Sequence, residues 1–433
     1  MFDTSACSRR QLLVSAAGAA AIAASGEVDP ARAAALPIEL PTFRFDGLIA
    51  SPVKIASIEL LRNGRTHFVR TRSSDGAAGL AITNERAAYL YPILEQLVAP
   101  YFVGKDARQI DALVDGVYVH QSNYKLAGLA LWNCAGWVEF SILDMLGKIA
   151  GKSVGELLGG VKRKQVAVYM SSMRRDTSPE QEVEWVGKRV AETGSRAVKL
   201  KIGGRMSRNA DASPGRTEKL VALARKTFGE GVAIYVDANG SYDAAKAIEV
   251  GRMLEDHNVA FFEEPCPWED YESTRKVAEA LKIPVAGGEQ DSSLLRFQEM
   301  VRDGVLDVIQ PDVNYNGGLI RTIRVAAMAA AKNLPVTPHS PKSDPNEAYV
   351  LHFVSRTNNA GPHHEYAAAP SRPQEWYTPR MTVKNGMLDV PTGPGLGITI
   401  DPAYLEKAQV VMACGDVPAV FADASWPEVP PPP

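Results

Sequence analysis

Three carboxylates that each end a short apolar run are the residues of this sequence most able to do chemistry. Asp237, Glu263 and Glu289 are equally spaced, since the step from 237 to 263 equals the step from 263 to 289. A regular step of this length suits one strand and one helix of a parallel barrel. In such barrels the catalytic groups lie at the carboxyl ends of the strands. We therefore expect these three side chains to meet at one end of a barrel.

Three carboxylates at one point would repel one another unless a cation lay between them. Carboxylate oxygens are ligands that Mg²⁺ prefers. The sequence therefore predicts one Mg²⁺ per subunit at this group of acids. Glu264 is adjacent to Glu263, and the spacing alone does not decide which of the two binds the metal. Asn239 shares a face with Asp237 and would either bind a substrate hydroxyl or shape the turn that it begins.

Two lysines precede the acids on a strand that we expect at 197–202. Side chains alternate along a strand, so Lys199 and Lys201 share one face. Two ammonium groups on one buried face repel, and burial disfavours their charged forms. Both effects lower a lysine pKa towards the range where the side chain can act as a base. An exposed edge strand is the alternative, but the position just before the strand of Asp237 favours a catalytic pair.

An aspartate and a histidine continue the same series. Asp312 follows the strand expected at 306–310, and His339 follows the one expected at 335–338. A carboxylate beside a histidine fixes the tautomer of the ring and raises its basicity, which makes a proton-transfer pair. Asp307 competes with Asp312 for this role, but it begins its strand and would face the opposite end of the barrel.

The last expected strand, 363–366, carries a further acid. Glu365 would bind a substrate carboxylate if protonated, or would serve as a packed supporting residue. His363 and His364 are adjacent, so only one of them can point inward. Two adjacent histidines do not by themselves make a metal site.

Alternating strands and helices must position these groups. Amphipathic helical stretches at 179–192, 244–257 and 319–332 separate the expected strands. Eight strands in this pattern predict an α/β fold, a TIM barrel closed on itself. A doubly wound open sheet is the alternative, but the glycine-rich phosphate loop expected after its first strand is missing. The eight expected strands span 166–171, 197–202, 233–237, 259–263, 284–289, 306–310, 335–338 and 363–366.

An N-terminal α+β unit at 48–160 precedes the barrel, which we place at 161–379. Strands at 53–61 and 66–72 flank Asn63-Gly64, which is a strong hairpin signal. Helical patterns follow at about 84–99, 106–117 and 125–150. The turn-rich segment 380–425 should leave the barrel and pack back against the N-terminal unit.

The first 35 residues read as a removable twin-arginine signal peptide. Arg9-Arg10 precedes an alanine-rich apolar stretch, and Ala31-Arg32-Ala33 offers a cleavage site. The alternative is a disordered alanine-rich tail with a chance arginine pair. We expect export by this route and a periplasmic mature protein that does not span the membrane, since no later segment is long and apolar enough.

The bulk properties narrow the function class. The 433 residues carry a net charge of −3, which gives no basic field and argues against a nucleic-acid partner. Four scattered cysteines, one of them in the signal, do not form a disulfide framework. We expect a small carboxylate as substrate and a homo-oligomer as the assembled form.

Taken together, these motifs resemble the mandelate racemase subgroup of the enolase superfamily, from about Val53 to Asp401. The resemblance implies an α+β cap, completed by C-terminal residues, over a modified (β/α)7β barrel. It also implies Mg²⁺ on the three acids, with Glu263 chosen over Glu264. The motifs that carry it are K-x-K at 199–201, V-D-A-N at 236–239, F-E-E-P at 262–265, G-G-E at 287–289, P-D at 311–312 followed by N-G-G at 316–318, and T-P-H at 337–339.

The resemblance further implies acid–base roles. Lys201 would be a base on one face of the substrate, and His339, oriented by Asp312, would act on the other. Lys199 would help to bind the substrate carboxylate, and Glu365 matches the acid of the family at the last strand. Its His-His-Glu-Tyr context and the long polar loop at 203–215 depart from the family pattern.

The expected reaction begins with removal of the proton α to a carboxylate. Polar segments after the expected strands favour a polyhydroxylated acid, and so dehydration of an acid sugar to a 2-keto-3-deoxy acid. Racemisation or epimerisation of a 2-hydroxy or 2-amino acid would use the same residues. An exported sugar-acid binding protein and a metal aldolase are the remaining alternatives. Specificity should come from cap segments near 63–66 and 79–86.

Overall fold

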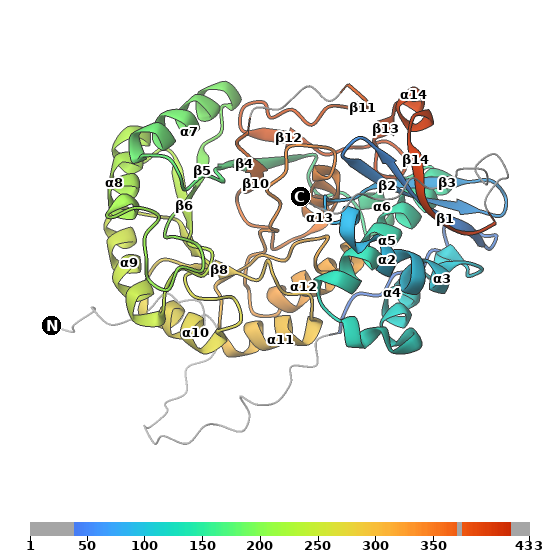
Figure 1. The fold of residues 1–433 in the computed structure, drawn as a ribbon, viewed down its shortest axis with the longest axis horizontal. Coiled ribbons are helices and arrows are strands. Elements are labelled where there is room, and N and C mark those ends of the chain that lie inside the picture. The colour runs from blue at the N-terminus through green and yellow to red at the C-terminus, as the bar shows by residue number, and fades with distance from the viewer. Residues whose placement is uncertain (1–38, 370–374, 417–433) are drawn as a thin grey trace, which may run out of the picture.

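A computed structural model describes residues 39–369 and 375–416 of the chain. Figure 1 shows two parts, with the cap on the right and an arc of barrel helices on the left. The expected signal peptide at 1–35 lies outside the described residues. Within those residues, no helix combines the length and apolar character needed to cross a membrane.

The cap is an antiparallel sheet covered by helices. Its strands are β1 (Ile55–Asn63), β2 (Thr66–Ser73), β3 (Ala78–Ile82) and β14 (Gln409–Gly415), in the order β14-β1-β2-β3. The predicted hairpin is confirmed, whereas β3 was not expected. Because β14 pairs with β1, C-terminal residues complete the cap sheet as predicted. The cap helices are α2 (Ala87–Ile93), α3 (Ala99–Phe102), α4 (Ile110–Val119), α5 (Leu129–Ala150) and α6 (Val154–Leu157).

The barrel alternates parallel strands with helices that cover them. Its strands β4 to β9 pair in sequence order, and the last strand, β10, pairs in parallel with the first, β4. These strands are β4 (Gln165–Ser171), β5 (Ala197–Lys201), β6 (Ala233–Asp237), β7 (Phe261–Glu263), β8 (Val285–Gly287), β9 (Val308–Ile309) and β10 (His364–Ala367). The helices are α7 (Pro179–Thr193), α8 (Arg216–Phe228), α9 (Ala244–Asp256), α10 (Tyr271–Ala280), α11 (Leu294–Asp303), α12 (Leu319–Ala330) and α13 (Glu347–Arg356).

The strand expected at 335–338 differs from the prediction. Instead of a full strand, Val336 makes single parallel bridges to Ile309 on one side and to Ala360 on the other. Pro335 and Pro338 explain the difference, because proline has no backbone N–H to donate to a sheet. The bridges still connect β9 to the segment that leads into β10.

The C-terminal segment returns from the barrel to the cap. Its β12 pairs antiparallel with β4, and its β14 joins the cap sheet. Trp376 stacks on Tyr404 and meets Phe68 of β2 edge-on, so aromatic contacts tie this segment to the cap. The elements here are β11 (Tyr377–Thr378), β12 (Met387–Asp389), β13 (Thr399–Ile400) and α14 (Pro402–Glu406).

Two layers of side chains fill the inside of the barrel. The lower layer is a buried apolar cluster near the amino ends of the strands: Tyr169, Ala197, Tyr235, Phe261, Ala286 and Val308. Because strand side chains alternate, residues two positions further on point into the same interior. These residues form a polar upper layer at the carboxyl ends: Ser171, Lys199, Asp237, Glu263 and Gln310.

Candidate metal centre and active site

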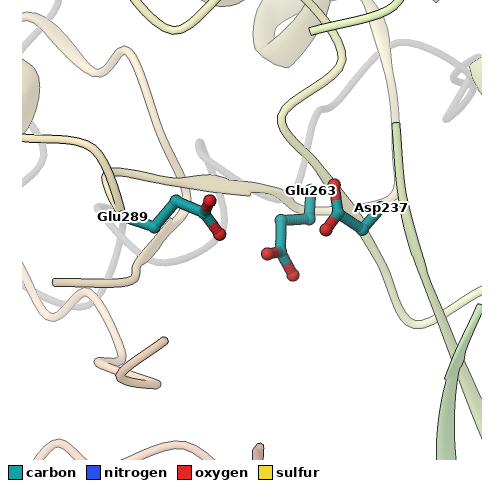
Figure 2. A group of neighbouring side chains, drawn as sticks. All are labelled: Asp237, Glu263 and Glu289. Carbon is teal, nitrogen blue, oxygen red and sulfur yellow. The ribbon is translucent and has the colours of Figure 1, made fainter. Parts of the chain in front are cut away.

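The three equally spaced acids meet at the carboxyl ends of their strands. Asp237 and Glu263 end β6 and β7, and Glu289 follows β8 by two residues. Each offers an oxygen that lies within 4.8 Å of the others, and all three residues are buried. Figure 2 shows the three carboxylates gathered in one region. The convergence that the spacing predicts is therefore present.

The chemistry of this cluster fits a hard divalent cation. All three donors are carboxylates, which suit Mg²⁺ better than a soft metal. Among the described residues, none donates a hydrogen bond to the buried Oε2 of Glu289. Glu264 is not among the three acids whose oxygens gather, and its carboxylate instead accepts a hydrogen bond from Asn239. The structure therefore brings Glu263, not Glu264, into the group of acids that could hold a cation.

Each acid of the cluster has a basic neighbour. Nζ of Lys199 lies 2.7 Å from Oε2 of Glu263, and Lys201 pairs with Asp237. Nε2 of His339 is 3.2 Å from Oε2 of Glu289, although without hydrogen-bond geometry. Three positive groups thus face three negative ones across the barrel mouth.

The expectation of a lowered lysine pKa is wrong for Lys199. Burial lowers the pKa of this side chain, but the charges of Glu263 and Glu365 outweigh burial and hold it well above its usual value. The two lysines do share one interior face, as expected. Their repulsion does not dominate, because a carboxylate pairs with each ammonium group.

Asp312 and His339 form the expected pair. Nδ1 of the His339 ring donates to Oδ2 of Asp312 at 2.8 Å, while the backbone N–H of Asn314 holds Oδ1 of Asp312. Burial lowers the pKa of His339, but Glu289 and Asp312 more than compensate and raise it to about 10. Asp307 instead accepts from the backbone of Val285 at the start of β8, the far end of the barrel, as predicted.

Glu365 is held by groups of the chain itself. Its Oε1 lies 2.7 Å from Nζ of Lys199 and accepts from Ser171, and its Oε2 accepts from the backbone N–H of Ser340. Burial raises the pKa of Glu365, but the charges of Lys199 and His339 outweigh it and the net shift is strongly downward. These contacts favour the alternative of a packed supporting residue, and a role of Glu365 in substrate binding stays a prediction.

The adjacent histidines point in opposite directions. His363 shares a hydrogen bond of 2.9 Å with the hydroxyl of Tyr235, so it belongs to the lower layer. His364 is fully buried on the other side of β10, and burial lowers its pKa to about 3. Neither ring reaches the acid cluster.

Asn239 is engaged by two other side chains. Its Oδ1 accepts from Arg175 at 2.8 Å, and its Nδ2 donates to Glu264 at 3.1 Å. A backbone φ of +43° shows that it also shapes the turn after β6. Its role in substrate binding stays a prediction.

Gln310 is a site residue that the sequence analysis did not single out. Its Nε2 donates to Oε2 of Glu263 at 3.1 Å, so it orients one carboxylate of the acid cluster. The signal was present, because Gln310 precedes Asp312 by two residues and shares its face. Of the two cap segments expected to set specificity, 63–66 contacts Tyr404 of the C-terminal segment, and its role in specificity stays a prediction. Segment 79–86 ends in Arg86, which reaches the barrel.

Comparison with other sequences identifies the relatives of this chain. The family described as Enolase C-terminal domain-like matches residues 181–404. The arabinonate dehydratase of Saccharolobus solfataricus is 29% identical over 372 residues, which cover 83% of this chain and 92% of the relative. The D-galactonate dehydratase of Ralstonia nicotianae is 28% identical over 368 residues, which cover 79% and 90%.

Solved structures agree with the sequence comparison. A proposed racemase from Roseobacter denitrificans has a TM-score of 0.79 and 34% identity, covering 84% of this chain and all of the other. A mandelate racemase/muconate lactonizing protein from Paracoccus denitrificans, solved with magnesium, has a TM-score of 0.77 and 25% identity, covering 83% and 99%. On the match at 181–404, the cap over a barrel and the gathered acids, the chain belongs to the enolase superfamily, beside mandelate racemase and muconate lactonizing enzyme.

Proposed function

We propose that this protein is a Mg²⁺-dependent dehydratase that converts an acid sugar to a 2-keto-3-deoxy acid. The observation that carries the proposal is that Lys201 pairs with Asp237 while His339 approaches Glu289, so two groups able to transfer a proton lie beside two different acids of the cluster. Binding alone requires no such pair. The dehydratase names of the two relatives, arabinonate and D-galactonate dehydratase, support the reaction class.

Asp237, Glu263 and Glu289 would hold the cation. When bound, Mg²⁺ would supply positive charge next to the substrate carboxylate, which favours loss of the neighbouring proton. Lys201 would accept that proton from C2. His339 would then donate a proton to the hydroxyl on C3, which leaves as water. The enol that remains takes up a proton at C3 and becomes the 2-keto-3-deoxy acid.

The hydrogen bonds of the site assign supporting roles. Asp312 holds the Nδ1 proton of His339, so Nε2 is the nitrogen that faces the reacting groups. Lys199, already within 2.7 Å of Glu263 and Glu365, would add positive charge near the substrate carboxylate. Glu365 would fix the position of Lys199, and Asn239 would meet a substrate hydroxyl.

Racemisation or epimerisation is the second candidate. The proposed racemase from Roseobacter denitrificans, at 34% identity, favours it. The same two side chains would then act on one carbon, with the proton removed by one and returned by the other. The two reactions differ in whether the C3 hydroxyl leaves.

The experiment is a screen of the purified protein with Mg²⁺ against acid sugars in D₂O. Dehydration by the wild-type protein should give a 2-keto product, detected as its semicarbazone. The Lys201→Met variant should give no such signal. Deuterium at C2 of recovered substrate without a keto product would instead establish racemisation or epimerisation. If no acid in the panel gives a keto product or deuterium exchange, the proposal is contradicted. A binding function would then explain the site better.

We also propose export by the twin-arginine route to the periplasm and assembly as a homo-oligomer. The arginine pair at 9–10 supports the first. Replacing both arginines by lysine should retain the protein inside the cell, as fractionation and immunoblotting would show. Light scattering after gel filtration measures the molar mass in solution. A molar mass equal to that of a single chain would contradict the proposed homo-oligomer.

A further inference from the structure

Arg86 joins the cap to the barrel beside the active site. It lies in the turn between β3 and α2, and one of its terminal nitrogens donates to the hydroxyl of Tyr315 at 2.7 Å. The other donates to the hydroxyl of Tyr89 at 3.0 Å. Its guanidinium carbon lies 4.9 Å from the centre of the Tyr315 ring. The contact spans the two parts of the molecule.

Tyr315 is an immediate neighbour of the catalytic histidine. Its ring centre lies 6.1 Å from that of His339, and its backbone N–H donates to Asp312 at 3.0 Å. A single phenol ring therefore separates the guanidinium of Arg86 from His339. The charge of Arg86 therefore lies near His339, whereas Lys199 and Lys201 pair with Glu263 and Asp237.

This guanidinium has no carboxylate partner among the residues that the structure describes. Within residues 39–369 and 375–416, Arg86 forms no ion pair. Its guanidinium donates hydrogen bonds to the hydroxyls of Tyr89 and Tyr315. Its neighbour Glu85 faces Lys342 instead, at 3.5 Å. The direct hydrogen-bond partners of this half-buried guanidinium are therefore neutral, so a ligand carboxylate would add a charge-assisted hydrogen bond.

Two buried polar atoms close to Tyr315 lack a hydrogen-bond partner among the described residues. In the described part of the chain, nothing accepts from the buried Nε of Arg86, and nothing donates to the buried Oδ1 of Asn314. Asn314 is next to Tyr315 and donates its backbone N–H to Asp312. Buried polar atoms without partners are uncommon in folded proteins, and a polar ligand is one way to satisfy them.

We propose that Arg86 binds a second anionic group at the far end of the substrate, so that six-carbon aldaric acids, with a carboxylate at each end, are preferred over aldonic acids. The inference rests on the proposed function and names its substrate class. One carboxylate would lie at the metal and Lys199, and the other would meet Arg86, whose planar fork matches a carboxylate or a phosphate.

The test compares acids that differ only at C6. D-glucarate is paired with D-gluconate and galactarate with D-galactonate, while 6-phosphogluconate separates a terminal phosphate from a terminal carboxylate. We expect a kcat/KM at least about 10-fold higher for the diacids. Arg86→Gln should lower the diacid values about 10- to 100-fold and lower the aldonic values less, so that the preference for diacids is lost. Arg65→Gln, an exposed arginine of the same domain, is the matched control.

Two outcomes would overturn the inference. One is a wild-type preference for aldonic acids that Arg86→Gln leaves unchanged, and the other is a preference for 6-phosphogluconate over both diacids. If no acid is turned over, the proposed function fails, and binding then decides the inference separately. A diacid must raise the Tm of wild type more than its aldonic partner does, and Arg86→Gln must remove that difference while its own ligand-free Tm shows that it folds.

Discussion

The lower and upper layers of the barrel interior lie two residues apart on the same strands, yet they have opposite chemistry. In the lower layer Tyr235 stacks on Phe261 with ring centres 4.1 Å apart, and Tyr169 lies 5.2 Å from Tyr235. In the upper layer, Asp237 and Glu263 lie opposite lysines. One layer excludes water and charge, whereas the other concentrates charge.

This difference shows how the barrel can hold mutually repelling groups in a fixed place. Aromatic rings pack rigidly and fix the strands from which the acids project. A carboxylate at the end of a fixed strand cannot move away from its neighbours, so the cluster keeps the close spacing that a cation needs. We infer that stability depends mainly on the lower layer and chemistry mainly on the upper.

Replacing Glu263 with Gln should have the largest effect on activity. The variant keeps the shape of the side chain but loses one metal-binding charge, so turnover should fall about 10⁴-fold or more and Mg²⁺ binding should weaken. Steady-state kinetics and calorimetric Mg²⁺ titration measure both. Phe261→Leu, two residues earlier on the same strand, should cost about 1 kcal/mol of stability and little activity. If Phe261→Leu lost as much activity as Glu263→Gln, the division of stability and chemistry between the two layers would be wrong.

The two inward-facing histidines give a second matched pair. His339→Gln should lower dehydration about 10²- to 10⁴-fold, because it removes a proton donor, while Lys201 still exchanges the C2 proton with D₂O. His363→Gln in the lower layer should change kcat by less than about 3-fold. Dehydration rates together with deuterium exchange followed by NMR distinguish the two. Loss of exchange in His339→Gln would mean that this histidine is the base for C2.

Removing a lower-layer ring should act on stability instead of chemistry. Phe261→Ala leaves a cavity against Tyr235 and Tyr169, and the free energy of unfolding should fall by about 3–5 kcal/mol. Urea denaturation measures this loss. The affinity for Mg²⁺, measured well below the Tm of the variant, should stay near that of wild type. A variant that unfolds normally but binds Mg²⁺ poorly would show that the rings tune the acids directly.

The smallest expected effect is a pH dependence. Burial lowers the pKa of His363 below its ordinary value, so the folded state disfavours its charged form. The unfolded chain therefore binds a proton more readily than the folded chain. Protonation of His363 thus favours unfolding, and the free energy of unfolding decreases as the pH falls below about 6.5. His363→Gln should make the Tm less sensitive to acid between about pH 7 and pH 5, measured by differential scanning fluorimetry. An unchanged slope would contradict this assignment.

The sequence predicts the barrel well because its signals are local. The alternation of apolar and polar residues, with an acid after each apolar run, places Asp237 and Glu263 at strand ends on one face. The hairpin at Asn63-Gly64 is confirmed for the same reason, since the turn chemistry and the flanking strands agree. The pairing of Asp312 with His339 follows from a shared register in neighbouring strands.

What the sequence did not predict depends on contacts between distant segments. The two prolines of 335–338 reduce that strand to single bridges held by its neighbours. Lys199 has a raised pKa only because Glu263 and Glu365, from two other strands, surround it. Arg86 meets Tyr315 across 229 positions, a contact that no local pattern indicates.

Closure of the barrel has a consequence for protein synthesis. Glu365 on β10 accepts from Ser171 on β4, 194 positions earlier, and pairs with Lys199 at 2.7 Å. A nascent chain that ends between His339 and Glu365 would already carry the three acids and His339, yet Lys199 would lack one of its two carboxylates. Contacts this distant in sequence form late and slowly. The chain must therefore leave the ribosome beyond Glu365 before the charge of Lys199 is balanced by both of its carboxylates.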